Sequence, residues 1–577
     1  MLNINTRYCI FSKIKIFILL LCVLFPVNLM AKSGKIPVFA GNGMVVSASE
    51  IASDTGRDIL KKGGNAVDAA VATAFSLAVT YPQAGNIGGG GFLVYHRSDG
   101  MVTSIDFREK APLAAGKQMY LDENGAVKDN SNHDGFLSIG VPGTVAGLYK
   151  AHALYGKLPW HDLLTPAIDL AEKGFPVTWG LSISLKDPFI KKRLQSCETS
   201  RKIYFHDNGK PLEPGFIWKQ PELGRTLRRI QKKGRDGFYR GETAKRLSGF
   251  ILSKGGIITL EDLEKYEAVE RKPVHGTYRG YDIYSMPPPS SGGIALIEML
   301  NVLEGFDLKA MGHNSAAYIH LLCETMRRAF ADRAEYLGDP DFNHGMPLNM
   351  LTSKGYAEKL RNTISPVNKS KSDPDAFNSV YESEDTTHLS AMDREGNAVS
   401  LTYTLEYHYG SGIVADGLGF LLNNEMGDFN AVPGLTDESG RIGTMPNLIA
   451  PEKRMLSSMS PTIVSLRGKP VLVIGSPGGR TIINTVLQVI LNYIDHGMNV
   501  AEAIEAGRFH HQWLPDIIYM EKNTISKDTE KILTGMGYKI EFRDYQGRAM
   551  GIGFDPVKKL IGGAADSRSY DGAAAGY

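Results

Sequence analysis

Two adjacent threonines, Thr386 and Thr387, stand where a polar segment meets a strand-like segment. A hydroxyl is a weak nucleophile unless a base lies beside it. If the chain is cut directly before a threonine, the freed α-amino group supplies that base within the same residue. The ordinary pKa of such an amine, about 7.7–8.0, leaves a useful neutral fraction near pH 7. The pattern therefore predicts an N-terminal threonine nucleophile, and spacing alone does not choose between the two threonines.

The residues around the threonines predict a hairpin with a linker before it. From Thr386 onward, apolar and polar residues alternate, residues 393–397 form a turn, and residues 398–404 return. Residues 362–385 are rich in Ser, Asn, Asp and Pro, which is the composition of an extended linker. The bond between Asp385 and Thr386 therefore lies where a linker ends and a strand begins, which suits cleavage.

Two glycine-rich segments are candidate anion sites. Gly478 and Gly479 lie between an apolar strand and a helix that begins near Thr481, so their N–H groups could bind an oxyanion. For this stretch alone, an ordinary strand-to-helix turn is the simpler interpretation. The segment "GNIGGGG" (residues 85–91) lacks the Gly-Lys-Ser/Thr ending of a phosphate loop and leads into a strand. It predicts close backbone packing instead of nucleotide binding.

Several classes of ligand are disfavoured. The histidines in "NHDG" (132–135) and "FHHQW" (509–513) have no spacing that suits a zinc tetrahedron, so we expect neither a metal nor a cofactor. The net charge is +2 without a long basic run, which argues against nucleic acid as a partner. Cys197 and Cys323 are too few for a disulfide framework. One bridge between them stays open, although Cys323 lies in a helical pattern typical of a buried free thiol.

The N-terminus has the pattern of an export signal. Lys13 and Lys15 precede an apolar run over residues 16–30, and Ala31 ends it. The run is short for a bilayer span and is broken by Pro26, which favours cleavage near Ala31 over an uncleaved anchor. We therefore expect residues 1–31 to be removed, and the protein to be exported to the periplasm or secreted without a stable membrane anchor.

The remaining elements predict the fold class. A strand near residues 45–48 precedes two helices, and strands follow at residues 92–95 and 103–107. Residues 140–360 are mainly helical, and later segments return to strands and then to helices. The sequence thus has strands near its beginning, helices in its middle and strands again near its end. This order predicts an α+β sandwich of sheets covered by helices on both faces.

Many segments, in the same order, resemble those of γ-glutamyltranspeptidases, with bacterial secreted members the nearest. They are "GGNAVDAAVA", "PQAGNIGGGGF", "DFREKAP", "GTVAG", "YSMPPPSSGG", "TTHLSAMDREGNAVSLTYTL", "LLNNEMGDF", "RMLSSMSPTIV", "GSPGG" and "GRFHHQWLP". The similarity runs from about Met44 to Tyr577. It implies the four-layer αββα fold of N-terminal-nucleophile hydrolases, made as one self-cleaving precursor. Cleavage between Asp385 and Thr386 would give a large chain, 32–385, and a small chain, 386–577, which form one heterodimeric unit.

The same resemblance implies a catalytic set. Thr386, the first threonine of the family's Thr-Thr-His, would attack the γ-carbonyl of glutathione or another γ-glutamyl amide. Thr404 matches the threonine that holds the nucleophile, and the N–H groups of Gly478 and Gly479 match the oxyanion donors. The γ-glutamyl-enzyme would then be released to water or to an amino acid or dipeptide acceptor.

The resemblance also implies a substrate-binding set. The substrate needs a cation to bind its α-carboxylate and hydrogen-bond acceptors to bind its α-ammonium. The planar guanidinium of an arginine suits the carboxylate. The matching residues are Arg108 for the carboxylate, Ser457 and Ser458 as its hydroxyl partners, and Asp428, Glu425 and Glu406 for the ammonium.

Two departures from the family pattern affect the expected chemistry. Glu406 stands where many members have asparagine, which changes the hydrogen bonding of the site. Residues 433–451 resemble the lid over the pocket, but Ser439 lies near the place where some members have an aromatic residue. A more open site would favour water over acceptor amines.

Two other functions fit parts of the sequence. A β-lactam side-chain acylase shares the fold, but it does not need the α-amino acid recognition set that includes Arg108 and Asp428. An uncleaved precursor could act as a binding or structural protein. A denaturing gel distinguishes the uncleaved precursor from the processed enzyme, because a processed chain gives two bands and an uncleaved chain gives one.

Overall fold

The structure is a computed structural model that describes residues 35–373, 385–435, 437–439, 441–555 and 558–577. The predicted signal, residues 1–31, and residues 374–384 of the predicted linker lie outside the described residues. Residues 36–577 form one compact unit. Among the helices that the structure describes, none combines the length and the apolar character needed to cross a bilayer.

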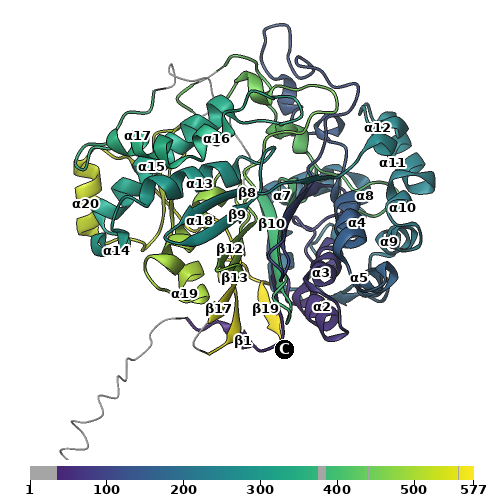
Figure 1. The fold of residues 1–577 in the computed structure, drawn as a ribbon. Helices are drawn as coiled ribbons and strands as arrows, with labels where there is room; N and C mark the ends of the chain where they lie inside the picture. Colours follow the sequence, from purple (N-terminus) through teal and green to yellow (C-terminus); the bar gives the residue numbers. More distant parts are fainter. Residues whose placement is uncertain (1–34, 374–384, 436, 440, 556–557) are drawn as a thin grey trace, which may run out of the picture. The chain divides into compact units, whose positions relative to one another are not determined.

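The predicted hairpin lies near the middle of one sheet (Figure 1). Strand β10 (Asp385–Met392) pairs antiparallel with β11 (Ala398–Glu406), as the alternation and the turn predicted. In the described residues this sheet has seven strands in the order β19-β2-β10-β11-β3-β4-β7. The other strands are β19 (Ala573–Gly576), β2 (Met44–Ser47), β3 (Gly90–His96), β4 (Val102–Phe107) and β7 (Val269–Arg271).

A second sheet packs against the first. Its described strands follow the order β1-β18-β17-β13-β12-β9-β8, and β10 contacts β13 and β17 across the space between the sheets. The bounds are β1 (Val38–Ala40), β18 (Leu560–Ala565), β17 (Met550–Asp555), β13 (Lys469–Gly475), β12 (Thr462–Leu466), β9 (Tyr281–Ser285) and β8 (Val274–Tyr278). Polar side chains join the sheets, since the Ser390 hydroxyl donates to the Met550 carbonyl at 3.0 Å.

Two groups of helices lie on opposite sides of the paired sheets (Figure 1). The β10 sheet packs against α2 (Glu50–Lys61), α3 (Ala66–Thr80) and α4 (Thr144–Tyr155), and α5 (Trp160–Lys173) packs on α3. Every residue of α3 is buried, which explains its alanine-rich sequence, because small side chains permit close contact on all sides. The second sheet packs against α13 (Gly292–Leu303), α18 (Thr481–Ile494) and α19 (Val500–Glu505). The predicted α+β class is confirmed.

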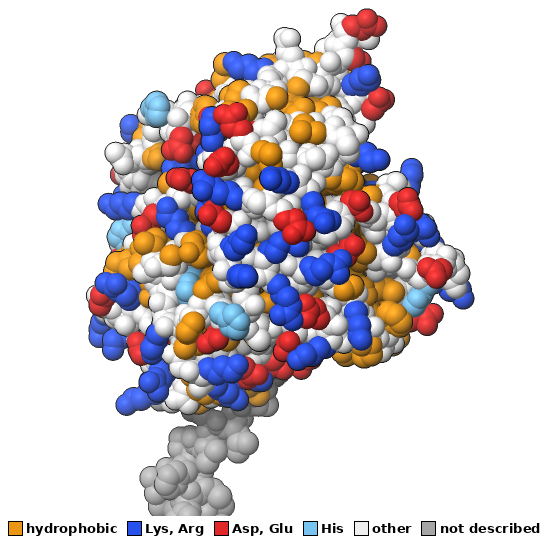
Figure 2. All heavy atoms as spheres, turned by 90° about the vertical axis from the view of Figure 1, so that its right-hand side faces the viewer, with side chains coloured by type: hydrophobic (Ala, Val, Ile, Leu, Met, Phe, Trp, Pro, Cys, Tyr) orange, Lys and Arg blue, Asp and Glu red, His pale blue; other side chains and the backbone are white. Residues whose placement is uncertain are grey.

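The remaining elements lie around these layers. They are α6 (Trp179–Ser184), α7 (Pro188–Ser196), α8 (Glu198–Tyr204), α9 (Pro221–Lys233), α10 (Asp236–Tyr239), α11 (Gly241–Ser253), α12 (Leu260–Lys265), α14 (Leu308–Met311), α15 (Ala316–Tyr336), α16 (Leu348–Leu351), α17 (Lys354–Asn362), α20 (Lys527–Gly535), β5 (Phe175–Pro176), β6 (Ile217–Trp218), β14 (Phe509–His510), β15 (Ile518–Glu521) and β16 (Ile540–Arg543). Over the face shown in Figure 2, basic and acidic side chains are intermixed with apolar ones, as the small net charge predicts.

The glycine-rich segment packs as the sequence predicted. A Cβ atom on Gly89 would overlap the Thr404 carbonyl oxygen, and one on Gly88 would overlap the Leu421 carbonyl oxygen. Only glycine therefore fits where this segment passes the end of the hairpin. Cys197 and Cys323 are both free thiols, and Cys323 is buried in α15, so the bridge that the sequence left open is not formed.

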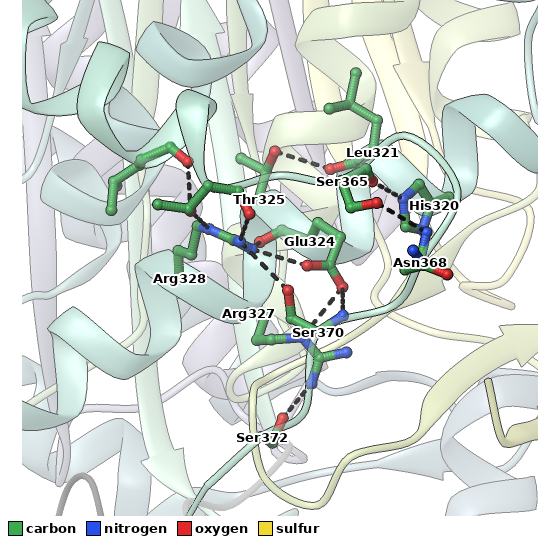
Figure 3. A network of polar contacts seen from close by, with 12 residues as sticks. His320, Leu321, Glu324, Thr325, Arg327, Arg328, Ser365, Asn368, Ser370 and Ser372 are labelled. Carbon is green, nitrogen blue, oxygen red and sulfur yellow. Dashed lines mark hydrogen bonds and ion pairs between the residues drawn. The ribbon is translucent and has the colours of Figure 1, made fainter. Parts of the chain in front are cut away.

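A polar network on α15 holds residues 365–372, which belong to the first part of the predicted linker (Figure 3). Glu324 accepts hydrogen bonds from the Ser370 backbone N–H at 3.1 Å and from Arg328 at 2.9 Å. Arg327 donates to the Ser372 hydroxyl and forms an ion pair with Asp516. We call Glu324, Arg327, Arg328 and the segment 365–372 the α15 clamp.

Candidate active site

One cavity brings together all of the predicted catalytic and substrate-binding residues except Gly478. They come from distant parts of the sequence: the ends of strands β4, β10 and β11, the turn η4 (Glu425–Asp428), the loop before β12 and the turn between β13 and α18. The lining residues are Arg108, Thr386, Thr404, Glu406, Glu425, Asp428, Ser457, Ser458, Met459, Gly479 and Ile482.

Thr386 lies at an irregularity of the hairpin. Asp385 pairs with Glu406 and Thr387 pairs with Tyr403, so the single residue Thr386 faces two residues of β11. Such a bulge changes the direction of a side chain and is common beside active sites. The strand begins one residue earlier than expected, at Asp385. Thr387 is buried as well but does not line the cavity.

Gly478 and Gly479 connect β13 to α18. Both have positive φ values, 129° and 52°, and a Cβ atom on Gly478 would overlap the Thr481 hydroxyl oxygen. The Gly478 carbonyl accepts from the Thr481 N–H and hydroxyl at 2.9 and 2.6 Å. Neither glycine N–H donates a hydrogen bond to another described residue. The two N–H groups therefore stand at the start of a 14-residue helix, where an anion is stabilised.

Arg108 lies directly after β4 and is 1% exposed. It forms ion pairs with Glu425 and Asp428, and it donates to the Met455 and Leu456 carbonyls at 3.3 Å. Burial opposes its charge, but the neighbouring carboxylates outweigh this effect and raise the pKa of Arg108. The guanidinium is therefore a fixed positive charge in the cavity wall.

Acidic side chains surround this arginine. Glu425 and Asp428 belong to the 3₁₀ turn η4 (Glu425–Asp428), and Glu406 ends β11. Burial raises the pKa of Glu425 and of Glu406 well above the usual carboxyl range. A cationic group entering the cavity would stabilise the charged forms of these carboxyls. The site is therefore electrostatically suited to a ligand that carries an ammonium group.

The serine pair is held from behind by the segment "PPPSSGG" (residues 287–293). The Ser291 N–H and hydroxyl both donate to the Ser457 carbonyl at 2.7 Å. Arg333 of α15 donates to the Ser291 hydroxyl at 2.8 Å and to the Ser458 hydroxyl at 3.2 Å. This segment therefore fixes the wall of the cavity that carries both predicted hydroxyl partners.

Thr404 also lines the cavity. Its hydroxyl accepts a hydrogen bond from the Glu406 N–H at 2.8 Å. This contact bends the end of β11, where Glu406 has a positive φ of 77°. Thr404 therefore orients Glu406, and it lies opposite Thr386 in the hairpin.

Two residues near the cavity were not predicted. Glu109 follows Arg108 in "DFRE", and burial raises the pKa of its carboxyl to about 8 against the opposing charge of Arg108. The Nδ1 atom of His133 lies 2.8 Å from Oε1 of Glu406. From the sequence, this histidine is a candidate only for metal binding, which its spacing disfavours. The spacing of residues in the sequence does not predict a contact between the loop that carries His133 and the end of β11, because the two segments are far apart in the chain.

The segment that resembles a lid, residues 433–451, contributes no described residue to the cavity lining. Ser439 is exposed, and its hydroxyl donates to Asp437 at 2.6 Å. The same carboxylate group pairs with Arg441, so this part of the loop is held by its own side chains.

Comparisons with known proteins agree with the sequence motifs. A family model described as gamma-glutamyltranspeptidase matches residues 52–576. The glutathione hydrolase proenzyme of Escherichia coli (strain K12) is 47% identical over 544 residues, which cover 94% of this chain and 93% of that protein.

Solved structures are similar as well. The cephalosporin acylase from Bacillus halodurans matches with a TM-score of 0.83 at 28% identity, covering 96% of this chain and 99% of that one. The Helicobacter pylori gamma-glutamyltranspeptidase matches with a TM-score of 0.55 at 43% identity, covering 59% of this chain and 94% of that one. The family match spans nearly the whole chain, and the sequence relatives cover it almost completely. The chain belongs to the γ-glutamyltranspeptidase family.

Proposed function

We propose that this protein is a self-cleaving γ-glutamyltransferase and glutathione hydrolase with Thr386 as its nucleophile. The observation that carries the proposal is the composition of one cavity. It joins Thr386 to a buried arginine, a set of buried carboxyls and a pair of serines. A γ-glutamyl group ends in an α-carboxylate and an α-ammonium, and this cavity supplies partners for both charges.

Self-cleavage would come first. The Thr386 hydroxyl attacks the Asp385 carbonyl carbon, the C–N bond breaks, and the Asp385 acyl group becomes an ester on Thr386. The proton of the hydroxyl passes to the departing nitrogen, which becomes the α-amino group of Thr386. Water then hydrolyses the ester, which releases the Asp385 carboxyl and restores the hydroxyl. The name proenzyme, carried by the Escherichia coli relative, supports a precursor of this kind.

Turnover would use the same oxygen. The α-amino group of Thr386 accepts the hydroxyl proton as the oxygen attacks the γ-carbonyl carbon of the donor. The N–H groups of Gly478 and Gly479 would stabilise the oxyanion, and Thr404 would orient the nucleophile. The departing amine takes the proton. Water or an acceptor amine, from an amino acid or dipeptide, then opens the γ-glutamyl ester.

Donor recognition would require the present ion pairs to rearrange. Arg108 now pairs with Glu425 and Asp428, and a donor carboxylate would replace part of this contact with a bidentate one. The donor ammonium would compensate the released carboxylates, and Ser457 and Ser458 would donate to the donor carboxylate. Both charges of the donor head are therefore needed together.

The larger organisation belongs to the same proposal. We infer a four-layer αββα sandwich of the N-terminal-nucleophile type, with a large chain of residues 32–385 and a small chain of residues 386–577. Removal of a signal over residues 1–31 would place the enzyme in the periplasm or outside the cell. None of the described residues of the segment 433–451 lines the cavity, which supports a site open to water. Hydrolysis is therefore expected to exceed transfer at saturating glycylglycine, and a dominant transfer rate would contradict this.

An acylase of β-lactam side chains is the second candidate, because a cephalosporin acylase has a similar fold. A side chain such as glutaryl has no ammonium group. The buried carboxyls beside Arg108 would then have no cation to meet, so the cavity favours the γ-glutamyl donor.

The test compares wild-type protein with Thr386→Ala and Thr386→Ser. Wild type is expected to give two bands on a denaturing gel and to release glutamate from glutathione. Thr386→Ala is expected to remain one band without activity, while Thr386→Ser keeps a nucleophile and cleaves. Circular dichroism confirms that each variant is folded. A Thr386→Ala protein that splits or turns over glutathione would refute the assignment.

A further inference from the structure

The glycine-rich segment "GNIGGGG" carries a buried asparagine that contacts the end of the hairpin. Asn86 is 4% exposed and lies shortly before β3. Its Nδ2 atom donates to the carbonyl oxygens of Thr404 and Ala84, both at 2.8 Å. Its Oδ1 atom accepts from the Gly89 N–H at 2.9 Å and from the Thr144 hydroxyl at 2.7 Å. The amide therefore uses both of its N–H donors and both lone pairs of its oxygen.

These four hydrogen bonds fix the orientation of the Asn86 amide. If its nitrogen and oxygen exchanged places, the nitrogen would face the N–H group of Gly89, and the oxygen would face two carbonyl oxygens. A buried polar group without a partner is costly, so the side chain cannot turn on its own. Asn86 therefore joins the end of β11 to the first residue of α4, Thr144, in one arrangement.

The backbone of the same segment packs against the Thr404 carbonyl. A Cβ atom on Gly89 would lie 2.0 Å from the Thr404 carbonyl oxygen. The Gly89 carbonyl accepts from the N–H groups of Gly143 and Thr144 at 2.7 and 3.0 Å, and Thr404 itself pairs with Gly90 of β3. The Thr404 backbone is therefore held at a distance that a larger residue at position 89 would not permit.

Thr404 is the residue of β11 at which this support reaches the cavity. Its side chain and that of Thr386 both line the cavity, and its hydroxyl accepts from the Glu406 N–H at 2.8 Å. A shift of the Thr404 backbone would therefore move a side chain beside the nucleophile. A displacement of about 1 Å in a reacting group can lower a rate about 100-fold.

We propose that Asn86 is a positioning residue for the nucleophile, because it holds the backbone of Thr404 and so fixes the Thr404 side chain beside the hydroxyl of Thr386. The inference rests on the proposed function, in which Thr386 first attacks the bond before it and then attacks the donor. Asn86 does not line the cavity, so it acts through Thr404 and not on the donor. Both reactions of Thr386 depend on this support, and binding of the donor head does not.

Asn423 provides a matched comparison, because it contacts the same segment but supports the other half of the cavity. It is fully buried, and its Nδ2 atom donates to the carbonyls of Gly88 and Gly140 at 2.8 and 2.9 Å. Its Oδ1 atom accepts from the N–H groups of Gly140 and Glu425 at 2.8 and 3.0 Å. It therefore holds the start of η4, which carries two carboxyls proposed to bind the donor ammonium. Self-cleavage involves no donor, so Asn423 should influence donor binding alone.

The test measures two reactions of Asn86→Leu and Asn423→Leu, since leucine has a similar size and forms no side-chain hydrogen bond. Self-cleavage is followed on a denaturing gel during cell-free translation, and kcat and KM are then measured with L-γ-glutamyl-p-nitroanilide. Asn86→Leu should slow self-cleavage and lower kcat, each by about 10- to 100-fold, with KM changed by less than about threefold. Asn423→Leu should raise KM about tenfold, with both rates changed by less than about threefold. The exposed Asn124→Leu should match wild type.

A second route covers the case in which circular dichroism shows that Asn86→Leu does not fold. Thr144→Val removes one hydrogen bond to the Asn86 oxygen and keeps the size of the side chain. It should slow self-cleavage and lower kcat, each by about three- to tenfold, the scale of one hydrogen bond. Thr144→Ser keeps the hydroxyl and should match wild type.

The outcomes separate this inference from the proposed function. Unchanged self-cleavage in a folded Asn86→Leu protein, or in Thr144→Val where Asn86→Leu does not fold, would overturn the role of Asn86. Equal slowing of self-cleavage by Asn86→Leu and Asn423→Leu would overturn it as well, because it would indicate a general effect on folding. In each case, a wild type that cleaves before Thr386 and hydrolyses glutathione leaves the proposed function intact. A wild type that does neither would refute the proposed function itself.

Discussion

Arg108 determines the charge balance of the cavity at the scale of single residues. Its planar fork already makes three ion pairs, with Glu109, Glu425 and Asp428, and two carbonyl contacts, so a lysine cannot replace it. Arg108→Lys is expected to raise KM for γ-glutamyl-p-nitroanilide by about 10- to 100-fold, the scale of one lost charge-assisted hydrogen bond. The change in kcat should be smaller than the change in KM. Steady-state kinetics checks this, with the exposed Arg97→Lys as control, and equal KM values in wild type and Arg108→Lys would contradict it.

Glu109 gives a prediction about pH. The pKa of its carboxyl is raised to about 8 in the folded protein, mainly by burial. Relative to a neutral glutamine, its contribution to stability is complete below the unfolded pKa of about 4.3 and is lost as pH rises through about 8. Glu109→Gln should therefore match wild type in unfolding temperature near pH 5 and exceed it near pH 9. A difference between the two proteins that does not change with pH would contradict this.

Some site residues could be predicted and others could not. Thr386 and Gly478 stand in local patterns that indicate chemistry, while Arg108 became a candidate only through its motif. His133 has no such pattern, because its partner is supplied by a strand end far along the chain. Contacts of this kind arise from tertiary packing, so they cannot be predicted from the spacing of residues along the sequence.

The elements that position these residues were largely predictable. The hairpin β10–β11, the alanine-rich α3 and the strand-to-helix turn before α18 follow from local periodicity and turn residues. The alternation in β10 did not show which face is exposed, because the described residues of β10 from Thr386 onward are buried on both faces. Nor did it show the bulge opposite Thr386, since a bulge depends on the partner strand.

The α15 clamp gives a prediction at this scale. Glu324 binds Ser370 and Arg328, and these contacts lower the pKa of its carboxyl to about 2, although burial alone would raise it. Glu324→Gln should destabilise the protein by about 1–3 kcal/mol at pH 7. Since a lowered pKa stabilises only above the unfolded value of about 4.3, the difference should shrink as pH falls toward 2.

Thermal unfolding followed by circular dichroism measures this difference, and Glu358→Gln on the exposed side of α17 is the matched control. Equal unfolding temperatures for Glu324→Gln and wild type at pH 7 would show that the clamp does not contribute to stability.

At the scale of the whole molecule, both sheets combine strands from the two sides of the bond before Thr386. In one sheet β10 pairs with β2, and β11 pairs with β3. In the other, β12 pairs with β9, and β18 pairs with β1. The sequence indicated a sandwich of sheets and helices. It did not indicate this order of strands, because local composition does not predict which distant segments pair.

This arrangement predicts how the cleaved protein behaves. The two fragments should elute as one particle in size-exclusion chromatography without denaturant and should separate only in urea, because separation would break backbone pairing in both sheets. A nicked protein that gives two separate peaks in native buffer would contradict the shared sheets.

The central claim is that the oxygen of Thr386 becomes active when the peptide bond before it is cut. The most direct measurement is the N-terminal sequence and mass of the smaller fragment, followed through time together with glutathione hydrolysis. The account predicts that this fragment begins at Thr386, with Thr-Thr-His as its first residues, and that activity rises with its amount. A fragment that begins elsewhere, or full activity in the intact chain, would contradict the account.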